Sequence, residues 1–269
     1  MRRKRGTSRA SQCTNETWLN PNEHRDHGVQ GLCDAQEVLL IVPAFNEQDS
    51  IAKVVRAIEG SGYSYLVVND GSTDATAQLL EELNAPHVNL VENLGIGGAV
   101  QTGYKYALRH GYRIAVQFDG DGQHDVSYVD KLIEPILLDQ ADIVVGSRFV
   151  GSESAFRSSF ARRMGIRILS GLLKLTSGSY VHDVTSGFRA VNRKTMALFA
   201  HAYPIDYPEP ESLAYALARG FKVAEVPVAM HERSGGSSSI SGLGSMYYMI
   251  KVGLSILISG VKRPARRRK

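Results

Sequence analysis

The stretch Val116-Gln117-Phe118-Asp119-Gly120-Asp121-Gly122-Gln123-His124-Asp125 joins an apolar run to a group of acidic and glycine residues. The run is typical of a buried strand, and the glycines favour a tight turn after it. In open α/β sheets, ligands bind beyond the carboxyl ends of the strands. Asp119, Asp121 and the amide oxygen of Gln123 can therefore face one ligand, and such oxygen donors suit Mg²⁺ or Mn²⁺. A plain Asp/Gly-rich surface turn is the alternative.

Similar apolar runs recur along the chain and alternate with helical patterns. This alternation predicts βαβ units, a mostly parallel sheet and an α/β fold. Each run ends in polar or glycine residues, so five loops are expected along one edge of the sheet. The predicted strands are residues 38–42, 65–68, 88–91, 114–118 and 143–145, and the predicted helices are residues 48–59, 74–83, 97–110 and 126–138.

The charge of the chain is unevenly distributed. Its 269 residues are 43% hydrophobic and carry a formal charge of +4, but residues 1–9 hold five basic side chains and residues 262–269 hold six, with no acid in either segment. Between them, 20 basic residues face 27 acids. This distribution argues against a nucleic-acid-binding domain and favours tails that contact anionic lipid headgroups.

Three regions are expected from the composition. Residues 1–36 are polar and predict a disordered basic arm, and the lack of an apolar stretch after the first arginines argues against a secretory signal. Cys13 and Cys33 lie in this arm without ligand-like histidine spacing, so neither a disulfide scaffold nor a zinc site is expected. Residues 37–235 form the predicted globular domain, and residues 236–269 form a predicted membrane-associated amphipathic helix with a basic tail.

The loop after the second predicted strand reads Asp70-Gly71-Ser72-Thr73-Asp74. Asp70 stands at the strand tip, where a carboxylate can accept the N–H edge of a nucleobase. The last three residues of the loop are compatible with capping of the next helix alone. Further along, Gly95-Ile96-Gly97-Gly98 is followed by Val100 where a dinucleotide fingerprint requires glycine, so these glycines predict close packing of a helix start on the sheet.

Three of these stretches, in their order, resemble the motifs of family 2 glycosyltransferases. They are Ile41-Val42-Pro43-Ala44-Phe45-Asn46-Glu47, Val67-Val68-Asn69-Asp70-Gly71-Ser72-Thr73-Asp74 and Phe118-Asp119-Gly120-Asp121-Gly122-Gln123-His124. The resemblance implies a GT-A fold, which is a Rossmann-like three-layer α/β/α sandwich, and a UDP- or GDP-linked sugar donor. By position, it implies donor contacts from Pro43, Asn46, Glu47, Asp70, Gly71 and Asp119, and metal binding by Asp119, Asp121 and Gln123. Asn69 departs from the pattern, because many relatives have Asp there.

Three later stretches are similar to the polyprenyl-phosphate branch of that family, the dolichol-phosphate mannose synthase-like enzymes. They are Gly146-Ser147-Arg148-Phe149, Asp183-Val184-Thr185-Ser186-Gly187-Phe188-Arg189 and Arg233-Ser234-Gly235-Gly236-Ser237-Ser238. Guanidinium and backbone N–H groups suit phosphate oxygens. The alternative is that each arginine pairs with a surface acid. The predicted acceptor-phosphate residues are Arg148, Ser186, Arg189, Arg233 and Ser237, and the predicted catalytic residues are Asp121, Arg148, Arg189 and Arg233.

A phosphate acceptor simplifies the chemistry, because a phosphate monoester is already anionic at neutral pH and needs no general base. We therefore expect an inverting, metal-dependent transfer of one sugar to polyprenyl phosphate at the cytoplasmic face of the cell membrane. If the acceptor is a hydroxyl of a cell-wall or surface polysaccharide, Glu209 or Glu211 is the expected base. A third possibility is a membrane module that binds a nucleotide sugar without turnover. No spacing rule identifies the sugar.

Two segments suit a lipid acceptor and a membrane surface. Residues 243–261 are mostly apolar, but Lys251, Ser255 and Ser259 add a polar stripe. This stripe favours lying in the interface, or docking on a partner such as a small integral-membrane subunit, over spanning the bilayer. The other segment predicts a basic amphipathic helix, for which packing into the core is the alternative. Its apolar positions are Phe160, Met164, Ile168, Leu172 and Leu175.

Overall fold

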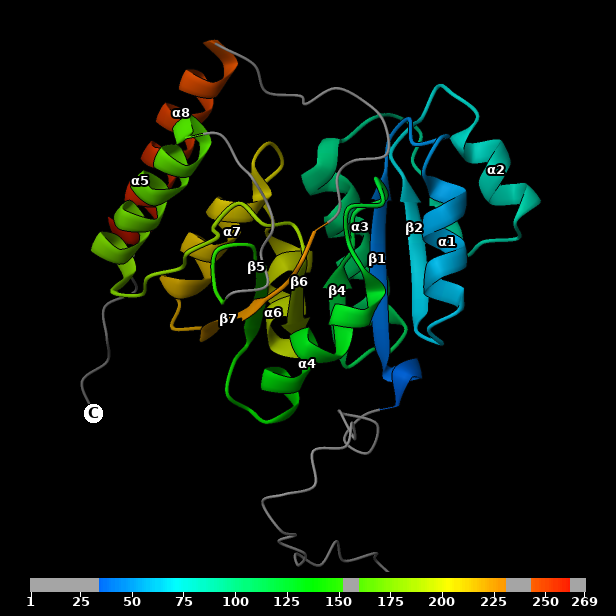
Figure 1. Cartoon of the computed structure of the whole chain (residues 1–269), viewed down its shortest axis with the longest axis horizontal. Coiled ribbons are helices and arrows are strands. Elements are labelled where there is room, and N and C mark those ends of the chain that lie inside the picture. The colour runs from blue at the N-terminus through cyan, green and yellow to red at the C-terminus, as the bar shows by residue number, and fades with distance from the viewer. Residues whose placement is uncertain (1–33, 152–159, 231–242, 262–269) are drawn as a thin grey trace, which may run out of the picture.

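The computed structural model describes residues 34–151, 160–230 and 243–261, which form a seven-stranded sheet between layers of helices (Figure 1). The strand order is β3-β2-β1-β4-β6-β5-β7. All neighbouring strands are parallel except at β6, which runs antiparallel to both β4 and β5. The strands are β1 (Val38–Ala44), β2 (Ser64–Asn69), β3 (His87–Asn89), β4 (Ile114–Gln117), β5 (Ile143–Ser147), β6 (Arg189–Asn192) and β7 (Val223–Pro227).

The elements predicted up to residue 147 are confirmed, with ends shifted by a few residues. Strands β6 and β7 and the helices at residues 193–201 and 208–217 were not predicted, because neither strand reads as a continuous apolar run. The helices are α1 (Ile51–Glu59), α2 (Thr76–Glu82), α3 (Gly95–Arg109), α4 (Val129–Leu137), α5 (Phe160–Ser177), α6 (Arg193–His201), α7 (Pro208–Leu217) and α8 (Leu243–Val261). Short 3₁₀ helices cover Ala35–Glu37 and Val126–Tyr128.

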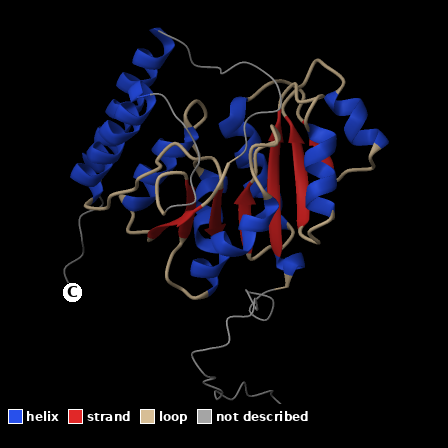
Figure 2. Ribbon diagram, in the orientation of Figure 1, coloured by secondary structure: helices blue, strands red, loops and turns tan. Residues whose placement is uncertain are grey.

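Strand β1 contributes side chains to two hydrophobic cores, one on each face of the sheet. All seven of its residues are buried, and alternate side chains point to opposite faces. Leu39 and Ile41 join the core formed with α3, α5, α6, α7 and α8. Leu40 and Val42 join the core formed with α1, α2 and α4. The helix, sheet and helix layers in Figure 2 therefore confirm the predicted three-layer arrangement.

The carboxyl ends of β1, β2, β3, β4, β5 and β7 lie at one edge of the sheet, because these strands share one direction. The expected loops are therefore side by side. Strand β6 runs the other way, so its first residue reaches the same edge, and Arg189 pairs with Gln117 at the end of β4. The antiparallel strand thus brings Gly187 and Phe188 next to the Asp119 loop.

Helices α5 and α8 pack side by side at one end of the molecule (Figure 1). Val252 and Ile256 of α8 are fully buried, while the ammonium group of Lys251 pairs with Asp206 just before α7. The polar stripe of α8 therefore contacts the chain's own α7 region. None of the helices in the described ranges is long and apolar enough to cross a membrane. The predicted arm lies outside the described residues up to position 33, and its last residues begin the first 3₁₀ helix.

Candidate functional site

The turn after β4 is fixed against β1 and the start of α1. A Cβ atom added at Gly120 would lie 2.9 Å from the Pro43 carbonyl oxygen, so only glycine allows the turn to approach β1 this closely. The Ser50 hydroxyl donates hydrogen bonds to the Gly120 carbonyl, at 2.9 Å, and to the Glu47 carboxylate, at 2.7 Å. Two of the predicted donor-binding residues, Pro43 and Glu47, therefore lie next to the predicted metal turn.

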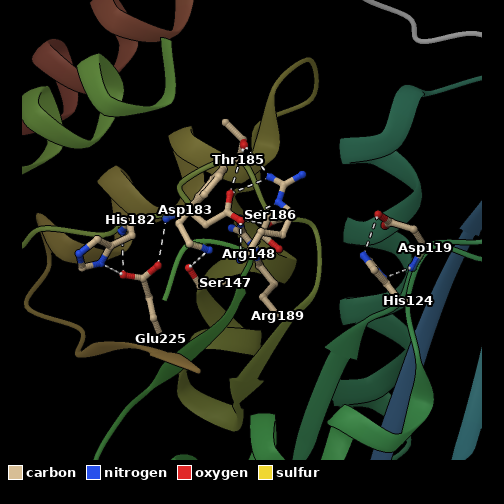
Figure 3. Close-up of polar contacts among 11 residues, drawn as sticks. Asp119, His124, Ser147, Arg148, His182, Asp183, Thr185, Ser186, Arg189 and Glu225 are labelled. Atoms are coloured by element: carbon tan, nitrogen blue, oxygen red, sulfur yellow. Dashed lines mark hydrogen bonds and ion pairs between the residues drawn. The ribbon is translucent and has the colours of Figure 1, made fainter. Parts of the chain in front are cut away.

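The buried His124 side chain holds the two ends of this turn together. Its Nδ1 accepts the backbone N–H of Asp119 at 3.0 Å, and its Nε2 lies 3.5 Å from Asp119 Oδ2 (Figure 3). The ring stacks on Phe188, with centroids 4.5 Å apart. Burial lowers the pKa of His124, although Asp119 and Asp121 both oppose this. The imidazole is therefore neutral, with its proton on Nε2, and both carboxylates lie close enough to act on it.

The predicted metal ligands fit a hard divalent cation by their chemistry. In the part of the chain that the structure describes, no three His, Cys, Asp or Glu side chains gather as a metal site. The predicted set is of another kind, because it combines two carboxylates with one amide. Asp121 accepts the backbone N–H of Gln123 at 3.0 Å, and the Asp119 side chain is 30% exposed. Asp119 and Asp121 would hold the cation, with Gln123 beside them.

The loops after β1 and β2 are held together by their own polar groups. The Asn46 side-chain oxygen accepts the N–H of Thr73 at 2.8 Å, while the Asn46 N–H donates to Ser72 Oγ at 2.9 Å. Asn46 has φ 55°, a left-handed conformation that asparagine tolerates better than most residues. The Glu47 N–H donates to Thr76 Oγ1 at 2.9 Å. These bonds place the predicted donor-binding residues of both loops on one surface.

Asp70 has a structural role that the sequence did not indicate. Its buried carboxylate accepts the N–H of Leu94 at 2.8 Å and so fixes the start of α3. Burial raises the pKa of Asp70, and the N–H groups of Leu94 and Gly95 oppose that rise. Gly71 has φ 68°, as the tight turn requires. Contact between Asp70 and a nucleobase stays a prediction. The N-cap of α2 is Ala75, but Asp74 accepts the N–H of Thr76, the first residue of that helix, at 2.9 Å.

The glycines at the start of α3 allow close packing, but the neighbours they approach are Leu94, Pro204 and Ile205 and not, as predicted, residues of the sheet. A Cβ atom at Gly97 would lie 2.0 Å from the Pro204 carbonyl oxygen, so this glycine packs against residues 204–205. The Gly97 N–H also donates to the Ile205 carbonyl at 3.2 Å. It is Gly103, one and a half turns later, that packs on Ile41 of the sheet.

Arg148 is held by a buried acid. Its Nε and Nη2 donate to the two carboxylate oxygens of Asp183, at 2.7 and 2.8 Å, and Nη2 also donates to Thr185 Oγ1 at 3.1 Å (Figure 3). Asp183 accepts the backbone N–H of Arg148 as well, at 3.0 Å. The ion-pair alternative thus holds for this arginine, although the partner is buried instead of on the surface. Contact with an acceptor phosphate stays a prediction.

Arg189 is fully buried and supports two backbone segments. Its guanidinium donates to the Ser186 carbonyl, to the Glu209 carbonyl at 2.9 Å and to Ser212 Oγ at 3.0 Å. In this structure it therefore positions the 186–189 turn and the first turn of α7, and its predicted contact with a phosphate stays a prediction. Within the described ranges, the buried hydroxyl of Ser186 has no hydrogen-bond partner. Arg233 and Ser237 lie outside the described residues.

Glu209 and Glu211, the two acids in the first turn of α7, face different parts of the molecule. Glu209 lies towards the sheet edge, where burial raises its pKa, Arg189 opposes the rise and Asp119 adds to it. Glu211 faces α8, where Ser255 and Lys251 oppose the rise in pKa that burial causes. Only Glu209 is therefore near the predicted metal turn. The structure adds three residues to which the sequence assigned no role: Gln117 and His124 contact Asp119, and Asp183 holds Arg148.

The family is shown by comparison with known proteins. Residues 39–198 match the model of the family described as glycosyl transferase family 2, so the chain belongs to that family. It is 30% identical over 234 residues to the polyprenol monophosphomannose synthase of Mycolicibacterium smegmatis, covering 81% of this chain and 86% of the relative. It is 32% identical to the UDP-N-acetylglucosamine–dolichyl-phosphate N-acetylglucosaminyltransferase of Methanococcus voltae, covering 71% and 84%.

The fold is also similar to a solved structure. Glucosyl-3-phosphoglycerate synthase from Mycobacterium tuberculosis, in complex with Mn²⁺, UDP and glucosyl-3-phosphoglycerate, matches with a TM-score of 0.65 at 20% identity, covering 93% of this chain and 88% of that one. At this identity the likeness shows the fold alone. It supports the GT-A arrangement that the sequence motifs imply.

Proposed function

We propose that this protein is an inverting, metal-dependent glycosyltransferase that moves a sugar from a UDP- or GDP-linked donor to a polyprenyl phosphate. The observation that carries the proposal is the meeting of two groups of side chains at one edge of the sheet. His124, which holds the acidic turn together, stacks on Phe188 with ring centroids 4.5 Å apart, and Gly187 lies directly against the Asp119 carboxylate. The acidic turn and the arginine-bearing loop therefore share one site, and both relatives named above use a polyprenyl or dolichyl phosphate.

The roles of the residues follow from their positions. A divalent cation at Asp119 and Asp121 would neutralise the diphosphate of the leaving group. The loops of Asn46 and Gly71 would bind the nucleoside, and the 183–189 loop would face the acceptor. An oxygen of the acceptor phosphate forms the bond to the anomeric carbon as the bond to the nucleoside diphosphate breaks, and the diphosphate keeps the electron pair. Because the attack is from the opposite side, the anomeric configuration inverts.

The α5–α8 pair provides a surface for the membrane that carries such an acceptor. Met164, Ile168 and Leu175 of α5 are exposed, whereas Ile166, Leu169 and Leu173 are buried and form the packing face. The predicted amphipathic stripe is thus mostly on the outside, beside the exposed Arg163, Arg167 and Lys174. Apolar groups flanked by basic ones are typical of interfacial helices. The exposed apolar residues of α8 are Ile250, Leu254, Leu257 and Ile258.

From this surface we propose peripheral binding at the cytoplasmic face of the cell membrane. The test is cosedimentation with vesicles that contain anionic lipid. Ile168→Glu and Leu254→Glu should each weaken binding, because they place a charge in the apolar surface. Leu138→Glu is the matched control, since Leu138 is equally exposed but follows α4 in another part of the chain. Equal binding by all three variants would exclude the α5–α8 surface.

The activity test uses radiolabelled UDP- and GDP-sugars with membranes that contain the protein, with and without a chelator. We expect label in a mild-acid-labile lipid, its loss with the chelator, and its loss in Asp121→Asn. If sugar transfer persists in the presence of the chelator and also in the Asp121→Asn variant, the metal assignment is wrong.

A second candidate acceptor is a glycan hydroxyl, and the position of Glu209 favours it. A carboxylate near the metal turn with a raised pKa is suited to accept a proton from a hydroxyl. Label found only in polysaccharide, together with loss of transfer in Glu209→Gln, would support this acceptor over the lipid phosphate.

A further inference from the structure

Behind the predicted metal turn, one buried amide joins two acids. Gln117 is the last residue of β4, and its side chain is fully buried. Its Nε2 donates to Asp119 Oδ1 at 3.4 Å, and the same side chain lies close enough to the Glu209 carboxylate to lower its pKa by hydrogen bonding. The Tyr203 hydroxyl donates to its Oε1 at 3.5 Å. A hydroxyl at the oxygen end and two carboxylates at the nitrogen end define which way the amide points.

The amide is also held from the sides. Gln117 pairs across the sheet with Arg189, whose Nη1 holds the Glu209 carbonyl at 2.9 Å. On the other side, a Cβ atom at Gly187 would lie 3.0 Å from Gln117 Nε2 and 2.9 Å from Asp119 Oδ2. The backbone at Gly187 therefore blocks the amide and the carboxylate from moving towards this side.

We propose that Gln117 is a positioning residue that holds Asp119 in its metal-binding orientation by bridging it to Glu209. This inference rests on the proposed function, because it requires Asp119 to be a metal ligand. Asp119 raises the pKa of Glu209, so the two carboxylates repel each other, and an uncharged amide with two N–H donors can lie between them without adding charge. Asp119 Oδ2 remains on the side of His124. Groups that orient a metal ligand in this way typically change metal affinity when they are removed.

The test measures Mn²⁺ binding by electron paramagnetic resonance in the full chain, with UDP and in parallel with GDP. Gln117→Leu removes both N–H donors while it keeps an apolar volume in the buried site. We expect its Mn²⁺ affinity to fall roughly 10- to 100-fold, while nucleotide affinity in chelator and the melting temperature stay near those of the control. The control is Gln101→Leu, because the Gln101 side chain donates to the Phe199 carbonyl and accepts from the Lys105 ammonium group, both at 3.3 Å, and neither residue belongs to the predicted metal site.

Two further arms keep the result interpretable. Gln117→Met replaces the amide with a flexible apolar chain of similar length, and it serves if Gln117→Leu does not fold. Mn²⁺ affinity equal to that of Gln101→Leu in a folded Gln117 variant would overturn the inference. Asp121→Asn tests the proposed function separately: if that variant still binds Mn²⁺, the metal assignment itself fails, whatever Gln117 does.

Discussion

Gly187 offers the sharpest test of how the 183–189 loop and the metal turn depend on each other. Gly187→Ala adds one methyl group at a residue whose backbone is not left-handed, so the backbone itself tolerates alanine. The new Cβ atom would lie 2.9 Å from Asp119 Oδ2 and 3.1 Å from Asp119 Oδ1. Ordinary contacts begin near 3.4 Å, so the Asp119 carboxylate must move by about 0.5 Å.

We expect this displacement to reduce metal binding more than stability. Added methyl groups in well-packed sites cost about 1–3 kcal/mol, but the partly exposed Asp119 side chain can rotate away and avoid most of that cost. Rotation takes the carboxylate out of its metal-binding position. We therefore expect Mn²⁺ affinity to fall roughly 10-fold, which corresponds to about 1.4 kcal/mol, with a similar rise in the Mn²⁺ concentration that supports half-maximal transfer.

The assay compares Gly187→Ala with Gly171→Ala, which lies in α5 with no atom within 4 Å of an added Cβ. The control should bind Mn²⁺ normally and be more stable by about 0.5–1 kcal/mol, because alanine is a better helix former than glycine. A folded Gly187→Ala protein with the Mn²⁺ affinity of the control would refute the reasoning. So would a large loss of stability with unchanged Mn²⁺ binding.

Three further predictions concern stability, each measured by thermal or urea unfolding. Arg148→Met should lower the free energy of unfolding by about 3–5 kcal/mol, because it leaves the buried Asp183 without its charged partner, and adding Asp183→Leu should recover part of that loss. Asp70→Ala should cost about 1–2 kcal/mol by leaving the Leu94 N–H without its acceptor. Glu209→Gln should stabilise the metal-free protein at neutral pH. Burial raises the pKa of Glu209, so the parent loses stability as the pH rises through the pKa of Glu209 in the folded protein. The difference in stability between variant and parent should vanish below the pKa of Glu209 in the unfolded chain. An equal effect of Glu209→Gln at all pH values would contradict that assignment.

Local patterns were enough to identify the first half of the fold. Strands such as β1 are buried on both faces and read as continuous apolar runs, and the polar residues at their ends mark the loops of the sheet edge. The predicted metal turn stands out in the sequence for the same reason, because the carboxylates and glycines that shape it are adjacent in the chain. A candidate site whose residues are adjacent in the chain can therefore be recognised from the sequence alone.

The partners of the buried polar groups depend on strand β6, which runs antiparallel to both of its neighbours and which the sequence did not predict. This four-residue strand has no distinctive pattern, yet it sets Arg189 opposite Gln117 and carries Gly187 onto the Asp119 carboxylate. The bond between Arg148 and Asp183 joins residues 35 positions apart, and that between Arg189 and Ser212 joins residues 23 apart. A guanidinium group can bind a ligand phosphate or an internal acceptor equally well. Its choice here depends on which groups the fold leaves within reach, and such contacts between distant residues arise from topology and not from local spacing.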